Sequence, residues 1–368
     1  MKKWIIIGVT TAVVVIASVG AVGYVVLRQA SSKPDVVESM VRVSDMRDVS
    51  DAAWSPDGST ILFASYPNIW KIDSDGENQT CLGEGGCPTW SPNGSQIAFD
   101  GDNGLEIMKA DGSGRHCLAD FSEFVPPTTE HWWLETTAWS LDGRIIAFEV
   151  WAWVPDPSDL SGQSGTQPTL IWTVNADGTN LKRLTADTAY ERNPSWSADS
   201  QSIVFSSDRS DGTWATWTSR VDGSGQPELA EGWCVSPDGS RIAYMTEDED
   251  LWLKDADGGN AVEVAGGPAW YQNWAWSPDG TMLAFDSTVV GPVGNIWIVN
   301  ADGTGKTKLT GATRDSFDCT PEWFQYKEPQ WSPDGTKLLF LNGLDKGNTG
   351  RGYDRLWVLE LDLENGLS

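Results

Sequence analysis

The sequence predicts an all-β fold, a seven-bladed β-propeller of four-stranded antiparallel blades, preceded by one N-terminal transmembrane helix. The chain has 368 residues with 22 Trp, 38 Gly and 19 Pro, and aromatic residues favour strands whereas Gly and Pro mark turns. A five-residue box of the Trp-Ser-Pro-Asp-Gly type recurs seven times, and only one apolar stretch has membrane length. We therefore expect one anchor followed by one repeat domain.

The anchor is expected in residues 1–28. Trp4 to Leu27 form a 24-residue stretch without a charged side chain, which as a helix would be about 36 Å long, enough to span a bilayer. Residues 29–36 read as a polar linker, and residues 37–368 as the propeller.

The localisation that follows is the cell membrane, with a single pass and the propeller outside the cytoplasm. Lys2 and Lys3 precede the apolar stretch, whereas Arg28 and Lys33 follow it, so the charges favour a cytoplasmic N-terminus only modestly. The alternative is a signal peptide cleaved at the small residues 17–21, which would leave a secreted or periplasmic protein.

The repeated box defines the strands that we expect in each blade. The boxes lie about 46 residues apart on average, a period typical of propeller blades. Each box is followed by a short apolar run such as Ile61–Phe63, so it is expected to join strands a and b of a hairpin. A second hairpin, turning at sequences such as Ala176-Asp-Gly178, supplies strands c and d. The boxes start at Trp54, Trp90, Trp139, Trp196, Val235, Trp276 and Trp331.

The last repeat lacks its own outer strand, because few residues follow Leu356–Asp362. Met40–Ser44 precede the first box and are placed to supply that strand, which would close the ring and cover an exposed edge. The alternative is six blades, with the poorest box, Trp196–Ser200, not forming a blade.

The boxes resemble the repeats of the TolB-like β-propeller family over about residues 38–365. The resemblance implies the propeller fold and says little about activity, because this architecture carries enzymes and scaffolds alike. TolB proteins have a separate N-terminal domain, whereas this chain has only the apolar segment and linker in that place, so their cell-envelope role is not carried over.

Twelve Trp occupy two repeating positions in strands a and c, where they are expected to pack between blades. Nine others lie in or beside the b–c and d–a connections, which emerge on one face, here called the loop face. The a–b and c–d turns emerge on the opposite turn face. These nine are Trp132, Trp133, Trp151, Trp153, Trp214, Trp233, Trp270, Trp274 and Trp323.

Trp beside carboxylate suits sugar rings or cationic groups. We therefore expect a non-enzymatic propeller that binds a protein or a glycan through the loop face. Two alternatives stay open: these Trp fold the long loops onto the propeller, or carboxylates at the channel mouth act as a lyase or hydrolase. The candidate ligand-binding residues are Trp132, Trp133, Trp151, Trp153, Trp270, Trp274, Trp323, Glu130, Glu135 and Glu322.

Other functions are disfavoured by composition. Against 25 Lys and Arg stand 52 Asp and Glu, a formal charge of −27, which repels nucleic acid. Two histidines and the absence of a Gly-x-Ser-x-Gly elbow leave no assigned catalytic residue, metal ligand or cofactor site. Asp73-Ser-Asp75 looks like part of a calcium loop but reads better as a turn. Of the five cysteines, Cys81 and Cys87 are candidates for a disulfide.

Overall fold

The computed structural model describes residues 36–123, 131–155, 165–166, 169–185, 190–197, 199–210, 213–224, 234–246, 248, 250–266, 269–270, 273–289, 293–310, 323–345 and 354–363. The expected anchor and nearly all of the linker lie outside these segments. Within them, no helix is long and apolar enough to cross a membrane.

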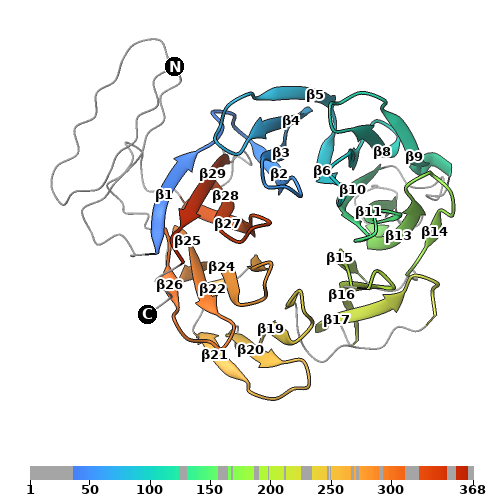
Figure 1. Ribbon diagram of the computed structural model, residues 1–368. Helices are drawn as coiled ribbons and strands as arrows, with labels where there is room; N and C mark the ends of the chain where they lie inside the picture. Colours follow the sequence, from blue (N-terminus) through green and yellow to red (C-terminus); the bar gives the residue numbers. More distant parts are fainter. Residues whose placement is uncertain are drawn as a thin grey trace, which may run out of the picture.

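The described segments form seven antiparallel blades arranged in a ring (Figure 1). The six-blade alternative is therefore wrong: the box at Trp196 forms an ordinary strand a–b hairpin. Blade 1 contains β2 (Val49–Trp54), β3 (Thr60–Ser65), β4 (Asn68–Asp73) and β5 (Thr80–Glu84). Blade 2 contains β6 (Gly86–Trp90), β7 (Gln96–Asp100), β8 (Gly104–Lys109) and β9 (His116–Asp120), followed by the 3-10 helix η1 (Phe121–Glu123).

Blades 3 to 5 continue the ring. Blade 3 contains β10 (His131–Trp139), β11 (Ile145–Pro155), β13 (Thr169–Asn175) and β14 (Lys182–Arg183), with β12 (Gly165–Thr166) paired to the end of β11. Blade 4 contains β15 (Glu191–Trp196), β16 (Ser202–Ser210) and β17 (Thr213–Arg220), and the residues that follow, 225–233, lie outside the described segments. Blade 5 contains β18 (Cys234–Val235), β19 (Arg241–Met245), β20 (Leu251–Asp255) and β21 (Val262–Ala265).

Blades 6 and 7 share one sheet, because β25 and β27 pair in parallel at their starts. Blade 6 contains β22 (Ala269–Trp270), β23 (Trp274–Trp276), β24 (Met282–Val289), β25 (Val293–Asn300) and β26 (Thr307–Lys308). Blade 7 contains β27 (Trp323–Trp331), β28 (Lys337–Asp345), β29 (Arg355–Leu361) and, from the other end of the domain, β1 (Val37–Arg42).

The ring closes through β1, which pairs antiparallel with β29 from Val37 opposite Leu361 to Arg42 opposite Trp357. Figure 1 shows these two strands side by side. The closing strand was expected at 40–44 and begins three residues earlier. Val37 is buried against the blade 7 core, which explains the earlier start: its side chain gains burial.

The boxes hold neighbouring blades together. In four blades the indole Nε1 of the box Trp donates to the carbonyl just before the box of the preceding blade. These bonds are Trp54 to Gln330 at 3.3 Å, Trp196 to Ala138 at 2.9 Å, Trp276 to Cys234 at 3.3 Å and Trp331 to Ala275 at 3.0 Å. Such a bond contributes about 1 kcal/mol, and its repetition fixes the radial position of strand a.

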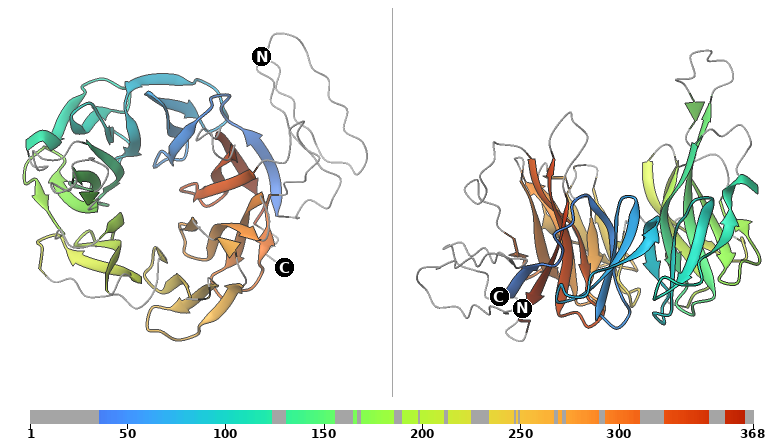
Figure 2. Two further views of the ribbon diagram at one scale, coloured as in Figure 1. Left: turned by 180° about the vertical axis from the view of Figure 1, so that it is seen from behind. Right: turned by 90° about the horizontal axis from the view of Figure 1, so that it is seen from above.

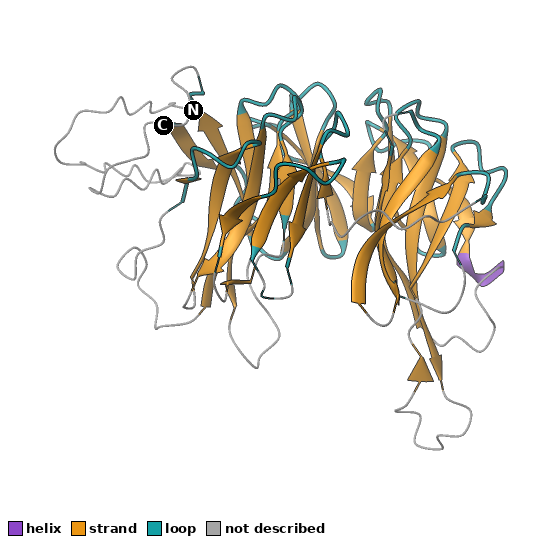
Figure 3. Ribbon diagram, turned by 90° about the horizontal axis from the view of Figure 1, so that it is seen from below, coloured by secondary structure: helices purple, strands orange, loops and turns teal. Residues whose placement is uncertain are grey.

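Strand b carries the largest core side chains. A fully buried Phe follows the box in six blades, at positions 63, 99, 148, 205, 285 and 340. The a–b turns are tight because their Ser and Asp bond each other, as when Ser55 Oγ donates to Asp57 at 2.6 Å and accepts the N–H of Thr60. The turns gather along one edge of the ring in Figure 3, which is the turn face.

The candidate disulfide between Cys81 and Cys87 is not formed, since both thiols are free. Cys81 is exposed on β5, the outer strand of blade 1, whereas Cys87 is half-buried on β6, the innermost strand of blade 2. Strands within a blade are about 4.8 Å apart, so a short sequence separation still places these residues at opposite edges.

Candidate functional site

The loop face is extended at blade 3, where β10 and β11 run beyond the neighbouring blades. Figures 2 and 3 show this ribbon and the short β12 at its end extending past the ring. Trp133 of β10 lies directly opposite Trp151 of β11. Their rings meet edge to face, with centroids 4.2 Å apart and planes at 78°. Trp133 is 39% exposed, so the structure brings two of the predicted residues together at the surface.

The other predicted residues are placed less completely. Trp132 and Trp153 lie in β10 and β11, Trp270 in β22 and Trp323 in β27, but their side chains lie outside what the structure describes. Glu130 and Glu322 lie outside the described residues altogether. Glu135 is exposed on β10. Trp274 is half-buried and packs against the core between blades 5 and 6, as expected for a Trp that holds blades together.

Strand a bends near the loop face in five blades. Its register shifts between residues 50 and 53, 86 and 89, 134 and 136, 192 and 195, and 327 and 330. Asp51, Cys87, Asn193 and Glu328, each three residues before a box, have positive φ of 50°, 46°, 54° and 57°. Such bulges turn a backbone N–H away from the ladder, so each needs another acceptor.

Carboxylates of the preceding blade supply the acceptor for three of these four residues, Cys87, Asn193 and Glu328. The N–H of Asn193 donates to Glu149 Oε2 at 2.9 Å, and that of Glu328 to Asp286 Oδ2 at 3.3 Å. Asp51 likewise accepts a hydrogen bond from the backbone of Cys87. A charged acceptor makes such a bond stronger than a neutral one. Carboxylates therefore link blades 1 to 2, 3 to 4 and 6 to 7 near the loop face.

Asp100, Glu149 and Asp286 are not among the residues predicted for the site. Each directly follows the buried Phe of strand b, in the sequences Ala-Phe-Asp or Ala-Phe-Glu. This recurrence of an acid at one repeat position, in blades 2, 3 and 6, is the signal that would have identified them.

Glu149 is a buried acid near the predicted site, with 3% of its surface exposed. Burial raises its pKa to about 7. The negative charge of Glu135 adds to this rise, whereas the N–H of Asn193, the hydroxyl of Thr136 and the charge of Arg192 oppose it. A carboxyl group in this range exchanges its proton near neutral pH.

Asp100 lies on the blade 2 side of the same region. Burial raises its pKa to about 7, and the charges of Glu106, Glu135 and Asp51 add to the effect. Its Oδ1 atom is buried and has no hydrogen-bond partner among the described residues. Glu135 thus acts on acids of two blades, because its charge also raises the pKa of Glu149.

Two nearby arginines are already paired. In blade 2, Glu106 occupies the strand c position that carries Trp in other blades; Arg115 bonds it and lies over the Phe99 ring, 4.8 Å from the centroid. In blade 4, Arg209 pairs with the buried Glu191 and lies 4.9 Å from the Trp217 ring centroid. These cations neutralise the acids that they contact, and their side chains are 31% and 18% exposed, respectively.

Cys87 offers no nucleophile, because burial and four carboxylates raise the pKa of its thiol, which lies 3.3 Å from the carbonyl of Leu134. No three His, Cys, Asp or Glu side chains of the described segments are arranged to hold a metal ion. A cavity of about 440 Å³ lies on the turn face between the boxes of blades 1 and 2, lined by Pro56, Lys71 and Trp90 among others. It is on the opposite face from the Trp pair.

No protein-family model matches the chain, and no curated protein sequence matches it. Solved structures do match. An oligogalacturonate lyase in complex with manganese has a TM-score of 0.65 at 16% identity, over 92% of this chain and 96% of that chain. Dipeptidyl peptidase 4 of Porphyromonas gingivalis has a TM-score of 0.50 at 14% identity, over 82% and 51%.

TolB of Acinetobacter baumannii matches with a TM-score of 0.45 at 17% identity, over 72% of this chain and 63% of that chain. At such low identities a likeness shows the fold and nothing about chemistry. Together with the blade topology, the comparison with the lyase establishes a β-propeller.

Proposed function

We propose that this chain is a membrane-anchored, extracytoplasmic, TolB-like propeller that binds a protein or a glycan through its loop face. The observation that carries the proposal is the Trp133–Trp151 pair, which stands on a ribbon beyond the ring and leaves Trp133 39% exposed. Exposed indole on a rigid strand is a typical binding element, because it gives a large contact at little entropic cost.

The contrast between the two faces supports the same proposal. On the turn face, Ser and Thr side chains donate to the Asp of nearly every turn, as Thr304 does to Asp302 at 2.6 Å. Nearly all of these Asp side chains therefore accept hydrogen bonds within their own turns. On the loop face, by contrast, the predicted Trp and acids lie on long strands and connections, where binding residues usually occur.

The test is a peptide and glycan array with the full-length chain in a neutral detergent. For any ligand found, Trp132→Ala and Trp323→Ala should weaken binding by about 1–3 kcal/mol with little change in unfolding. Asp111→Ala and Asp302→Ala, on the turn face, should leave the affinity unchanged. The assignment of the face fails if the turn-face variants abolish binding or if both Trp variants bind normally.

An enzyme is the second candidate, and the specific observation in its favour is the pair of acids, Glu149 and Asp100, with pKa raised to about 7. Acids in this range can exchange protons during lyase or hydrolase chemistry. Glu149, however, is nearly inaccessible and is bonded by Thr136 and Asn193, which suits a structural acid. Release of oligosaccharides from a polysaccharide panel, abolished by Glu149→Gln, would favour the enzyme.

A further inference from the structure

We infer that the loop face of blade 3 receives a lysine or arginine side chain of a partner protein, which lies against the Trp133–Trp151 pair and meets the carboxylate of Glu135. This inference rests on the proposed function and adds the ligand class and its position.

The aromatic part of the site is rigid. Trp133 and Trp151 face each other across two paired strands, and the strand continues through Leu134, which is buried in the core between blades 2 and 3. Thr169 of β13 continues the row beyond Trp151 and forms a bridge with Tyr190, which is 40% exposed. A cation over an indole face gains attraction from the ring electrons, and the alkyl part of Lys or Arg covers the ring.

The charged part lies two residues along β10. Glu135 is exposed, and its charge acts on Asp100 of blade 2 and on Glu149 of blade 3. A fourth acid, Asp51 of blade 1, also acts on Asp100. These four carboxylates therefore form one electrostatic group, and an arriving cation would relieve the repulsion among them.

Among the described residues, cations of the chain itself neutralise this group only in part. Arg115 is bound by Glu106, and Arg209 by Glu191. Lys327, whose charge acts on Asp51, is bound by Asp354 at 3.0 Å. The charge of Arg192 lowers the pKa of Glu149. The complementary ligand is cationic, and an acidic sugar of the kind named for the structurally similar lyase would be repelled.

Binding should release protons. A cation beside Glu135 favours the ionised forms of Glu149 and Asp100, whose pKa lies near 7 without ligand. The charges that act on Glu149 are those of Glu135 and Arg192. The charges that act on Asp100 are those of Glu106, Glu135 and Asp51. The affinity for a cationic peptide should therefore rise between pH 6 and pH 8, whereas a neutral sugar should bind equally at both.

The experiment measures fluorescence anisotropy of labelled Gly-Ser peptides carrying four Lys, four Arg or four Glu, with cellohexaose as neutral competitor. The protein is the full-length chain in neutral detergent. We expect the Lys and Arg peptides to bind and the Glu peptide not to bind. Trp133→Ala and Glu135→Gln should each weaken binding about tenfold, and Glu135→Lys should remove it.

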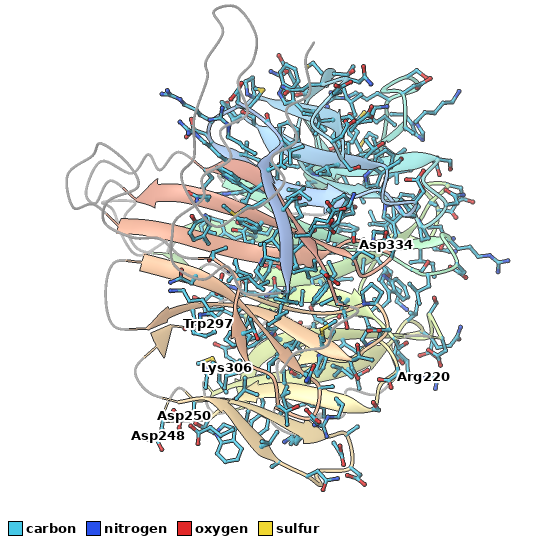
Figure 4. All side chains as sticks on the ribbon, turned by 60° about the vertical axis from the view of Figure 1, so that its left-hand side comes forward. Arg220, Asp248, Asp250, Trp297, Lys306 and Asp334 are labelled. Atoms are coloured by element: carbon cyan, nitrogen blue, oxygen red, sulfur yellow. The ribbon has the colours of Figure 1, made fainter. Side chains whose placement is uncertain are left out.

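Matched controls separate this site from general attraction to an acidic protein. Asp248→Asn removes the same charge from an exposed carboxyl in blade 5. Figure 4 shows Asp248 and Asp250 on one side of the propeller and Arg220 and Asp334, which belong to the turn face, on the other side. Leu141→Ala removes an exposed apolar side chain from the turn face. Both variants should change the affinity less than twofold.

Three results would overturn the inference. If Asp248→Asn weakens binding as much as Glu135→Gln, the attraction is not located at blade 3. If cellohexaose binds through Trp133 while the cationic peptides do not, the loop face binds a neutral glycan; the proposed function then stands and the cationic ligand is wrong. If Trp133→Ala and Glu135→Lys leave all binding unchanged, the blade 3 site fails. Circular dichroism of each variant shows that a loss of binding is not a loss of fold.

Discussion

Replacing Glu149 by Gln should stabilise the protein at pH 8 and change its stability little at pH 5. Gln keeps the shape and an oxygen that accepts from Asn193 N–H at 2.9 Å and from the Thr136 hydroxyl at 3.1 Å. It removes the buried negative charge. The variant therefore isolates the cost of ionising a side chain that is 3% exposed.

The size of the effect follows from the pKa of Glu149, which rises from 4.5 to about 7. A raised folded-state pKa favours folding when the group is protonated, so this stabilisation is present below the unfolded value and is lost as the pH rises through the folded value. The difference of about 2.5 units, at about 1.4 kcal/mol per unit, predicts a gain for Glu149→Gln of about 3 kcal/mol at pH 8. At pH 5 the gain should be below about 1 kcal/mol.

The measurement is urea unfolding of the wild-type protein and Glu149→Gln at both pH values. Asp248→Asn serves as the control, because an exposed substitution should change stability by no more than about 0.5 kcal/mol at either pH. An equal gain at pH 5 and pH 8, or a loss at pH 8, would refute the reasoning. A loss at pH 8 would mean that Asn193, Thr136 and Arg192 stabilise the ionised form of Glu149.

Two further predictions concern the ends of the chain. A chain beginning at Ser32 should be soluble and folded, with its membrane association lost in flotation assays; a full-length chain whose mature N-terminus lies near Ala21 in mass spectrometry would show a cleaved signal peptide instead. Deleting Val37–Arg42 should expose the edge of β29 and cost several kcal/mol or cause aggregation, and an unchanged melting temperature would contradict the ring closure.

Much of the fold was predictable because each blade repeats the same local signal. The box specifies a turn through its own Ser and Asp, and its Trp donates a hydrogen bond to the preceding blade. Ring closure by an N-terminal strand followed from the missing outer strand of the last repeat. The start of that strand was not predictable, because the burial of Val37 depends on the finished blade 7 core.

The candidate site was only partly predictable. Trp133, Trp151 and Glu135 stood out as residues that no repeat position required. Asp100 and Glu149 looked like ordinary strand ends, because the burial that raises the pKa of each depends on how neighbouring blades pack in the finished ring. Glu106 also marks this region in the sequence, because it is a charged residue at a position where six other repeats carry Trp.

The most direct test of the loop-face account is amide hydrogen exchange of the full-length chain with and without the four-Lys peptide. If the peptide binds at the loop face, exchange should become slower in residues 131–155 of blade 3 and stay unchanged in the box turns at 55–60 and 91–96 on the turn face. Protection of those turns without protection of blade 3 would contradict the account.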